Sequence, residues 1–379
     1  MDPHLNALID RIRHASQTRT PLRLRGGGSK DFHGNSLVGE VLDTRGLCGI
    51  RAYEPSELVV TVAAGTPLAE LEATLHAQGQ YLPFEPPHFA WSSPDAQATV
   101  GGMVAAGLAG PARATAGSVR DYVLGVQMVN GLGEHLTFGG QVIKNVAGYD
   151  VSRLMAGSLG TLGLITEVSL KVLPLPAAEA SLVFQADQAS ALEQLHRWGA
   201  QPLPLNASCW VRDDTAPGQP ELLFVRLRGA SAAVDAACTQ MLAELPGQRM
   251  DNAVAGPDWE HLRNQSLPFF TRPSPDAVLW RLSLPQTAPV LDLPWPQLVE
   301  WQGGLRWCWA PPDAAGRLQA AARQCNGSAS VFVADSAHST RAKGQFDTEN
   351  SAAVAIARRV KSAFDPHGIF NPHRLYADF

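Results

Sequence analysis

The chain has 379 residues, 45% of them hydrophobic, and a formal net charge of −5 at pH 7. A chain of this length holds two or three compact domains. The weak negative charge and the absence of like-charge runs exclude a nucleic-acid-binding protein and a long charged tail. An uncharged run at residues 99–112 is too short and too rich in glycine for a membrane span, which takes about 20 apolar residues.

Cysteine usage points to a reducing compartment. The five cysteines form neither a C-x-x-C pair nor a ferredoxin-like cluster; they are Cys48, Cys209, Cys238, Cys308 and Cys325. An iron–sulfur centre, a structural zinc or another metal site is therefore not expected. The N-terminal stretch MDPHLNALIDRIRHAS predicts an amphipathic helix and lacks the apolar core of a signal peptide. We expect a cytoplasmic protein with reduced thiols.

Residues 1–176 are predicted to form a glycine-rich α+β domain. From Leu22 onward, strand-like runs alternate with glycine turns, as LRLR, LVVTVAAG, YVLGVQMVNG and GLITEVSLKVLP. The segment LAELEATLHAQG predicts a helix with its leucines on one face, beginning after a Thr-Pro pair and ending at Gly79. Asn130-Gly131 predicts the turn of a hairpin.

Residues 177–345 are predicted to form a smaller α/β sheet domain. The order strand–helix–strand–strand–helix suggests a ferredoxin-like sheet, reduced in size, with helices on one face. The five segments that predict these elements, in chain order, are SLVFQAD, ASALEQLHRWG, LNASCWVRD, ELLFVRLRG and AAVDAACTQMLAEL. A less regular round follows, with AVLWRLSL and GLRWCWAP as strands and AAGRLQAAARQC as a helix. Boundaries within residues 247–302 are not predicted, because proline and tryptophan are dense there. The tail, residues 346–379, contains a helix over 351–364 followed by FDPHGIFNPHRLY.

The most informative motif is RGGGSKDFHG, which follows the strand-like PLRLR directly. Three consecutive glycines allow positive φ and a close approach of backbone to ligand, and successive N–H groups in such a turn form a concave nest for phosphate oxygens. Arg25 and Lys30 flank the turn and add positive charge. The Walker A and Rossmann spacings both fail, because Asp31 follows Lys30 and is the sixth residue from Gly26. The loop predicts a dinucleotide pyrophosphate site of another architecture; a glycine-rich surface turn is the alternative.

Three further segments accompany this loop. QATVGGMVAAGLAG, residues 97–110, has almost no side-chain bulk and predicts close packing against a flat ligand or a neighbouring chain segment. GSVRDYVLG, residues 117–125, places an Arg-Asp pair before a strand, where a solvated pair is the alternative. KNVAGYDVSRLMAGSLGTLGLITEV, residues 144–168, predicts a short helix capped by Asp150 and stopped by Gly157.

In this order, the four motifs resemble the FAD-binding domain of the vanillyl-alcohol oxidase/para-cresol methylhydroxylase (PCMH) superfamily, over roughly residues 20–176 and again in the tail. RGGGSKDFHG, KNVAGYDVSRLMAGSLGTLG and FDPHGIFNPHRLY are most similar to FAD-binding subunits of bacterial glycolate oxidase. The resemblance implies an α+β architecture: a PCMH-type FAD-binding domain, a smaller sheet domain, and a C-terminal segment that returns to the flavin.

The resemblance also implies which residues bind FAD. Arg25 supports the turn, and the pyrophosphate binds to Gly26, Gly27, Gly28, Ser29 and Lys30. The flavin and pyrophosphate are lined by Thr99, Val100, Gly101 and Gly102. Further contacts are implied for Gly117 and Ser118 near the ribose and flavin, for the Ile165 backbone near the adenine, and for Asn371 beside the flavin ring.

Two departures from the superfamily patterns matter. Members with covalent flavin carry a His where Ser29 stands or a Cys near Gly117, and His33 lies four residues beyond that slot, so non-covalent FAD is expected. Related 2-hydroxy acid dehydrogenases carry an HxGDGNxH-like run that supplies metal ligands and a base, and this sequence has no such run. His338 with Arg341 is the pairing that comes closest to it, and an exposed loop pair is the alternative.

The resemblance implies a FAD-binding subunit of a glycolate oxidase or dehydrogenase complex that oxidises glycolate or a similar 2-hydroxy acid. Electrons would leave through partners, a second FAD subunit and an iron–sulfur subunit, which could also hold the chain at the inner membrane. Two alternatives stay open. One is a self-sufficient FAD-dependent 2-hydroxy acid dehydrogenase, and the other is a flavoprotein fold retained as an assembly scaffold.

Overall fold

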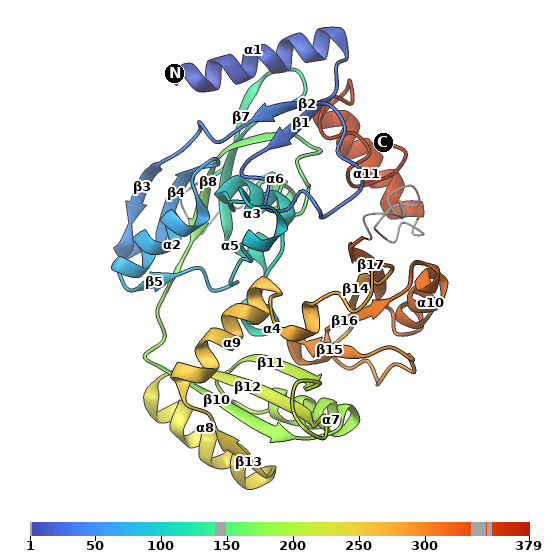
Figure 1. Ribbon diagram of the computed structural model, residues 1–379. Helices are drawn as coiled ribbons and strands as arrows, with labels where there is room; N and C mark the ends of the chain where they lie inside the picture. The colour runs from blue at the N-terminus through green and yellow to red at the C-terminus, as the bar shows by residue number, and fades with distance from the viewer. Residues whose placement is uncertain (1, 141–148, 335–345, 347–350) are drawn as a thin grey trace. The chain divides into compact units, whose positions relative to one another are not determined.

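The computed structural model describes residues 2–140, 149–334, 346 and 351–379 (Figure 1). The chain forms two compact units. Residues 1–108, 118–175 and 341–379 make up the first unit, and residues 109–117 and 176–340 make up the second. Within the described residues, no helix is both long and apolar enough to cross a membrane.

A five-stranded antiparallel sheet forms the centre of the first unit, in the order β3-β4-β8-β6-β7. Every residue of β4 is buried, because this strand lies inside the sheet and carries mostly valine. Its polar residue, Thr61, makes a 2.9 Å hydrogen bond to Ser169 of β8, which gives both buried hydroxyls a partner. The strands are β3 (Ile50–Glu54), β4 (Val59–Ala63), β6 (Val123–Val129), β7 (His135–Gly139) and β8 (Leu164–Lys171).

The N-terminal helix and the C-terminal tail share one hydrophobic core. Helix α1 (Pro3–Thr18) buries its apolar face, as predicted, and packs with the parallel strands β1 (Leu22–Arg25) and β2 (Glu40–Asp43). The predicted tail helix is confirmed as α11 (Ser351–Phe364). The core residues are Leu5, Leu8, Ile9, Ile12, Leu22, Leu42, Ile369 and Phe370, with others around them.

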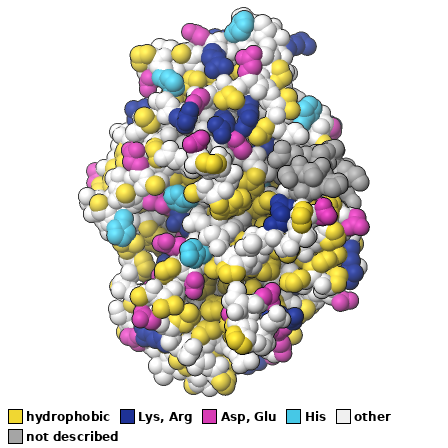
Figure 2. Space-filling model, viewed as in Figure 1, with side chains coloured by type: hydrophobic (Ala, Val, Ile, Leu, Met, Phe, Trp, Pro, Cys, Tyr) yellow, Lys and Arg dark blue, Asp and Glu magenta, His cyan; other side chains and the backbone are white. Residues whose placement is uncertain are grey.

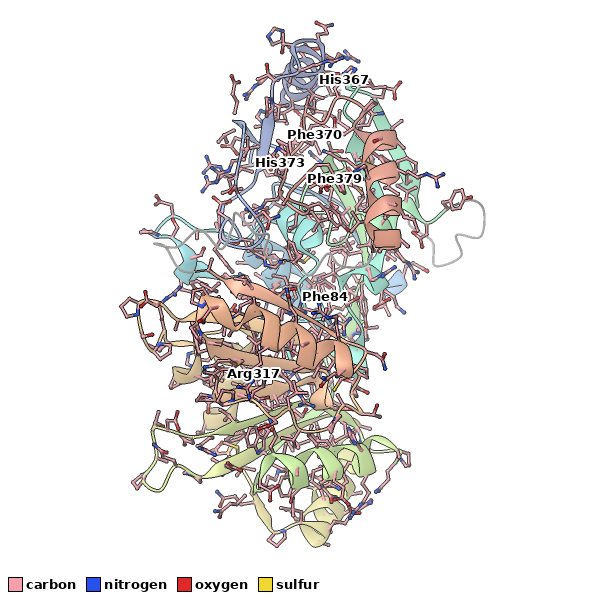
Figure 3. The ribbon with its side chains drawn as sticks, turned by 90° about the vertical axis from the view of Figure 1, so that its right-hand side faces the viewer. Phe84, Arg317, His367, Phe370, His373 and Phe379 are labelled. Atoms are coloured by element: carbon pink, nitrogen blue, oxygen red, sulfur yellow. The ribbon has the colours of Figure 1, made fainter. Side chains whose placement is uncertain are left out.

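After α11 the tail runs alongside β1. Leu22 N donates to Ile369 O at 2.7 Å, and Asn371 N donates to Leu22 O at 2.9 Å. Figure 3 shows His367, Phe370, His373 and Phe379 together in this region, beside α11. A single parallel β-bridge between Leu22 and Phe370 therefore joins the tail to the small β1–β2 sheet.

Short elements complete the first unit. The predicted helix after the Thr-Pro pair is confirmed as α2 (Leu68–Ala77). The predicted cap is confirmed as well, because the Asp150 carboxylate accepts from Arg153 N at 3.1 Å at the start of α6 (Val151–Leu154). The others are β5 (Gln80–Tyr81), α3 (Val100–Ala106), α5 (Val119–Tyr122) and β9 (Leu173–Pro174).

The hairpin between β6 and β7 turns where predicted but not through a two-residue turn. Its loop covers residues 130–134, and Asn130 Oδ1 accepts from the N–H groups of Leu132 and Glu134, each at 3.0 Å. Gly131 is required by the tail, since a Cβ there would lie 2.8 Å from Asp365 Cα. A glycine is therefore needed at position 131 because of a long-range contact with the tail, and not because of the type of turn.

An eight-stranded antiparallel sheet forms the second unit, in the order β13-β10-β12-β11-β15-β16-β14-β17. Its first half, β10–α7–β11–β12–α8–β13, has the ferredoxin-like strand order, with α7 and α8 packed on one face. Its second half repeats that order with β14, β15, β16, α10 and β17, and the halves join along β11 and β15. The bounds are β10 (Ala178–Gln185), α7 (Gln188–Gly199), β11 (Leu205–Arg212), β12 (Glu221–Gly229), α8 (Ser231–Glu244), β13 (Gly247–Arg249), β14 (Val278–Ser283), β15 (Gln297–Glu300), β16 (Leu305–Ala310), α10 (Ala315–Gln324) and β17 (Ser328–Val333).

The predicted α+β class is confirmed, and the sheet of the second unit is antiparallel. This sheet differs from the reduced one expected in that it holds two ferredoxin-like halves instead of a shortened one. Only the second half is reduced, because residues 284–296 form an irregular loop where the first half has α7. Helix α9 (Asn252–Asn264) was not predicted, since Pro257 lies inside it.

Residues 109–117 belong to the second unit, although the sequence placed them in the first domain. Their short helix α4 (Arg113–Ala116) packs on β11. Thr115 Oγ1 donates to Asn206 O at 2.8 Å, and Trp301 Nε1 donates to Gly110 O at 3.0 Å. Side-chain hydrogen bonds between distant residues fix this segment, and no local pattern reveals them.

Candidate functional site

The glycine loop follows β1, and each of its glycines is required for a different reason. A Cβ on Gly27 would lie 2.0 Å from Gln97 O, and one on Gly26 would lie 2.5 Å from Thr99 Oγ1. Only Gly28 has positive φ, at +74°. The sequence attributed the run to backbone freedom, but the first two glycines are needed mainly because residues 97–99 pack directly against them.

The loop presents free backbone donors. Across the described ranges, the N–H groups of Gly26, Gly27 and Gly28 donate no hydrogen bond. Farther along the loop, Asp31 N donates to Gly28 O and His33 N donates to Lys30 O, each at 3.1 Å. Unpaired backbone donors are rare unless water or a ligand accepts from them. Three in succession form the nest that a pyrophosphate requires.

The charges around the loop are partly neutralised. Asp31 accepts from Arg23 at 2.5 Å and from Arg25 at 2.8 Å, so these arginines brace the turn. Lys30 Nζ lies 3.2 Å from the buried Ser29 Oγ and 5.5 Å from the centre of the Phe89 ring. Figure 2 shows basic and acidic side chains gathered over the part of the first unit that holds β1 and β2.

The segment 99–102 packs against the loop, but it offers packing surface rather than free hydrogen-bond donors. Gln97 N donates to Gly27 O at 3.0 Å, which ties the two segments together. A Cβ on Gly101 would lie 2.7 Å from Ala64 Cβ, so this helix start is closely packed. The N–H groups of its first turn are already used, by Thr66 O for Val100 at 3.0 Å, by Ala64 O for Gly101 at 2.7 Å and by Thr99 Oγ1 for Gly102 at 3.3 Å.

Gly117 and Ser118 lie at the junction of two chain segments. Gly117 has φ +94° and ends α4, and Ser118 is buried at the start of α5. Ser118 N and Oγ both donate to Asp121, at 2.8 and 2.9 Å. Burial raises the pKa of Asp121, but these hydrogen bonds outweigh it and the pKa lies below its ordinary value. Asp121 is therefore a capping residue and not a solvated partner of Arg120.

Ile165 and Asn371 both occupy fixed positions in the first unit. Ile165 lies in β8 opposite Met128 of β6, beyond the point where β4 ends. Asn371 uses both polar atoms of its side chain within the protein. Its Oδ1 accepts from Leu24 N at 2.8 Å, and its Nδ2 donates to Leu159 O at 2.7 Å. Asn371 thus holds β1 in place, and its position beside the flavin ring stays a prediction.

Arg374 is a supporting residue that the sequence analysis missed. It is 4% exposed, and its guanidinium donates to carbonyl oxygens of the glycine loop segment. Nη2 donates to Asp31 O at 3.0 Å and to Lys30 O at 3.2 Å. Further short bonds reach the carbonyls of His33 and Asn35, and Asn35 N donates back to Arg374 O at 2.9 Å. The buried guanidinium of Arg374, a residue of the tail, therefore fixes the conformation of the glycine loop segment through its carbonyl oxygens.

A second buried cation locks the tail. Lys361 Nζ donates to Asp365 at 2.6 Å, to Thr161 O at 2.8 Å and to Phe370 O at 2.8 Å. The Asp365 carboxylate also accepts from the N–H groups of Ile369 and Phe370. Burial lowers the pKa of Lys361, while Asp365 opposes that shift. The pair is well supplied with partners, which is the condition for burying an ion pair.

His338 and Arg341 lie outside the described residues. Among the described residues, no group of three or more His, Cys, Asp or Glu side chains is placed to hold a metal ion. The catalytic pair suggested by the sequence stays a prediction.

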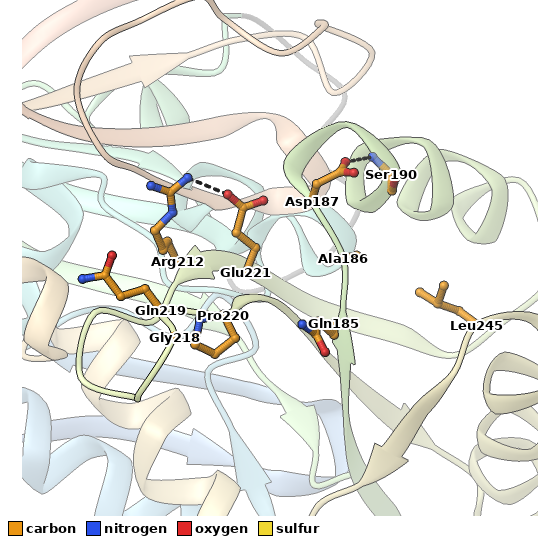
Figure 4. Close-up of a pocket in the computed structure, with 10 residues that line it drawn as sticks. All are labelled: Gln185, Ala186, Asp187, Ser190, Arg212, Gly218, Gln219, Pro220, Glu221 and Leu245. Carbon is orange, nitrogen blue, oxygen red and sulfur yellow. Dashed lines mark hydrogen bonds and ion pairs between the residues drawn. The ribbon is translucent and has the colours of Figure 1, made fainter.

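Two pockets lie within the second unit. One has a volume of about 670 Å³, and its charged groups are paired: Arg212 with Glu221 at 2.7 Å, and Asp187 with Ser190 N at 2.8 Å (Figure 4). The other, of about 750 Å³, is mainly apolar and includes Trp259, Phe269 and Trp309. Neither pocket includes the glycine loop, whose three successive N–H groups make it the stronger candidate for binding a pyrophosphate.

Comparisons with known proteins agree with this geometry. The model of the family described as "FAD binding domain" matches residues 4–139. Glycolate oxidase subunit GlcE of Escherichia coli (strain K12) is 43% identical over 372 residues, covering 98% of this chain and 97% of that protein. Glycolate oxidase subunit GlcD of Bacillus subtilis (strain 168) is 30% identical over 181 residues, covering 47% of this chain and 37% of that protein.

A solved structure supports the fold. Alkyldihydroxyacetonephosphate synthase matches with a TM-score of 0.65 at 16% identity, over 97% of this chain and 75% of that one. The α+β architecture and the glycine loop define the class as a FAD-binding oxidoreductase protein of the PCMH type. The predicted superfamily is thereby confirmed. The chain belongs to the GlcE family of glycolate oxidase subunits.

The residues present fit FAD. The three free N–H groups suit its pyrophosphate, and the tight contacts at Gly26 and Gly27 leave no room for side chains between the loop and residues 97–99. The roles implied for single residues of this site, from Arg25 to Asn371, remain predictions.

Proposed function

We propose that the chain is the FAD-binding subunit of a glycolate oxidase complex and takes part in oxidising glycolate, or a similar 2-hydroxy acid, to the 2-oxo acid. The observation that carries the proposal is the glycine loop with three free N–H groups, in a chain that aligns with a GlcE subunit over 98% of its length. FAD, when bound, supplies a two-electron acceptor. The chain's own residues bind its pyrophosphate at Gly26–Gly28 and brace that loop through Arg374.

The proposal extends to how the cofactor and partners are held. We infer non-covalent FAD, because Ser29 stands where covalent members have His. We also infer that electrons pass to sister subunits, a second flavin subunit and an iron–sulfur subunit, since the five cysteines are scattered. A cytoplasmic location, with attachment to the inner membrane through those partners, belongs to the same proposal.

An absorbance spectrum and an anaerobic glycolate titration test the proposal. We expect acid precipitation of the purified chain to release FAD, and we expect the chain alone to oxidise glycolate poorly. Without a positioned base, a factor of roughly 10²–10⁴ in rate is missing, so activity should appear on co-expression with sister subunits. Rapid flavin bleaching by glycolate in the isolated chain would favour a self-sufficient dehydrogenase. Absence of flavin after native purification would favour an assembly scaffold.

A further inference from the structure

The mainly apolar pocket of about 750 Å³ lies on the face of the second unit's sheet that α7 and α8 do not cover. Trp210 of β11 pairs with Val299 of β15, and both belong to the core beneath those two helices. Because side chains alternate along a strand, the neighbouring Cys209, Val211 and Leu298 project from the opposite face and line the pocket. The sheet therefore forms the floor of the pocket.

Helix α9 forms one wall through a single stripe of its surface. Ala255, Trp259 and Leu262 fall on one side of the helix by their spacing, and all three are buried and line the pocket. Trp259 Nε1 donates to Ser181 Oγ of β10 at 2.8 Å, which ties the helix to the sheet. This wall is therefore in place without a ligand.

The loop of residues 267–277 forms a second wall, and hydrogen bonds hold it in place. Trp309 Nε1 donates to Phe269 O at 2.7 Å, and Arg272 donates to Ala277 O within the loop. Three prolines restrict the backbone of this loop further. A wall that is already fixed loses little conformational freedom when a ligand binds.

Four aspartates from separate chain segments add negative charge to the pocket. They are Asp213 and Asp214 after β11, Asp258 on α9, and Asp276 before β14. Within the described part of the chain, the exposed carboxylates of Asp214, Asp258 and Asp276 make no hydrogen bond and no ion pair. Their charges are therefore available to a ligand at the edge of the pocket.

Arginines near the pocket do not neutralise this charge. Arg212 is paired with Glu221 at 2.7 Å. Arg226 and Arg272 lie over two tryptophan rings of the pocket, at 5.0 and 5.5 Å from the ring centres. With Glu221 included, the carboxylates outnumber these guanidinium groups, so the electrostatic potential at the rim favours a cation.

We propose that this pocket binds a small hydrophobic amine, whose apolar body lies among Trp259, Phe269 and Trp309 and whose ammonium group lies at the aspartates. The volume is in the range of small-molecule sites, which are mostly apolar with a few polar groups that orient the ligand. Repulsion by the aspartates disfavours an anion, and a neutral apolar molecule gains nothing from them. The site lies in the second unit and the inference does not depend on glycolate oxidation.

Calorimetric titration of the purified full chain with three ligands of similar shape tests the class of ligand. At neutral pH phenethylamine is positively charged, 2-phenylethanol is uncharged and phenylacetate is negatively charged. We expect phenethylamine to bind about fivefold more tightly than 2-phenylethanol, and phenylacetate not to displace it. The advantage of the amine should shrink in about 0.5 M NaCl, because salt screens exposed charges. Equal affinities of the amine and the alcohol would overturn the proposal, and so would failure of the amine to bind.

Two substitutions on one helix assign the charge. Asp258→Asn should weaken phenethylamine binding about two- to fivefold, as expected for an exposed ion pair. Glu260→Gln is the matched control, because Glu260 is exposed, does not line the pocket and lies on the other side of α9. Asp258→Asn combined with Asp276→Asn should weaken binding further, and unchanged affinity in this double variant would contradict the proposal. All of these side chains are exposed, so the melting temperature should stay at the wild-type value.

A third substitution tests the apolar wall. Phe269→Ala removes a ring from the pocket but keeps the backbone carbonyl that accepts from Trp309. Binding of phenethylamine and of 2-phenylethanol should both fall about tenfold, with the ratio between them preserved. Wild-type affinity for both ligands in a folded Phe269→Ala variant would place the amine elsewhere and overturn the proposal.

Discussion

In the first unit the glycine loop is made of backbone, whereas the core of the second unit is made of large side chains. Gly26, Gly27 and Gly28 offer bare N–H groups, and a Cβ on any of them would meet a neighbouring atom at 2.5 Å or less. In the second unit, by contrast, the buried rings of Phe184 and Trp198 pack against each other between the sheet and its helices. Substitution should therefore damage the first region mainly by adding atoms and the second mainly by removing them.

The largest expected effect is on the loop. Gly27→Val should abolish FAD binding, because its Cβ would lie 2.0 Å from Gln97 O and the tie between the two segments would break. The flavin-to-protein ratio after purification measures this. Lys30→Ala should keep part of the flavin, since the N–H nest survives.

Gly316→Val is the control for that experiment. A Cβ at Gly316 meets no atom within 4 Å, so flavin content there should equal that of the wild type. Wild-type occupancy in Gly27→Val would remove the loop from the cofactor site.

A core substitution in the second unit sharpens the comparison. Trp198 is fully buried beside Phe184, and its Nε1 donates to Glu244 at 2.7 Å. Trp198→Ala should lower the free energy of unfolding of that unit by about 3–5 kcal/mol. Below the melting transition, flavin content should stay near the wild-type value. Flavin loss in a protein that remains folded would contradict the assignment of FAD to the first unit.

Arg374→Ala removes the side-chain support of the loop. Four carbonyl oxygens lose their buried donor, which should destabilise the first unit by roughly 3 kcal/mol and weaken FAD binding about tenfold or more. Titration of the apoprotein with FAD, followed by flavin fluorescence, gives the affinity, and the melting curve gives the stability. Arg358→Ala is the control, because Arg358 is exposed and pairs with Asp378. A lower melting temperature with unchanged FAD affinity would show that Arg374 is only structural.

Thiol reactivity gives the smallest expected effect. Cys48 of the first unit is exposed, whereas Cys209, Cys238 and Cys308 of the second are buried. Burial raises the pKa of all three, for Cys308 to about 12, so their thiolates are scarce at neutral pH. A disulfide reagent at pH 7.5 should show a fast thiol that disappears in Cys48→Ser and a slower one from the half-buried Cys325. A fast phase that survives the combined Cys48→Ser and Cys325→Ser substitutions would contradict the burial of the other three cysteines.

Local patterns predicted those parts of the molecule that local physics determines. Helix α11 begins and ends where its apolar periodicity does, and the glycine run follows β1 directly, as predicted. Local patterns do not predict the parts of the structure that contacts between distant residues determine. A Cβ on Gly27 would collide with Gln97, and one on Gly131 would collide with Asp365. Neither contact has a signal in the neighbouring sequence. The buried arginine in FDPHGIFNPHRLY was a visible clue, since a cation within an apolar tail requires acceptors, but the sequence does not say which ones.

Support of the loop by the tail also sets an order of events during synthesis. Arg374 reaches carbonyl oxygens 339 to 344 positions earlier, and Asn371 reaches Leu24 N across 347 positions. The glycine loop leaves the ribosome early, yet its bracing residues emerge only after the whole second unit has been made. Since domains generally fold in order of synthesis, the second unit should already be folded while the first still waits for its last segment. We therefore expect the chain to retain flavin only after translation has passed residue 374, so a ribosome stalled before that point should carry a chain without flavin.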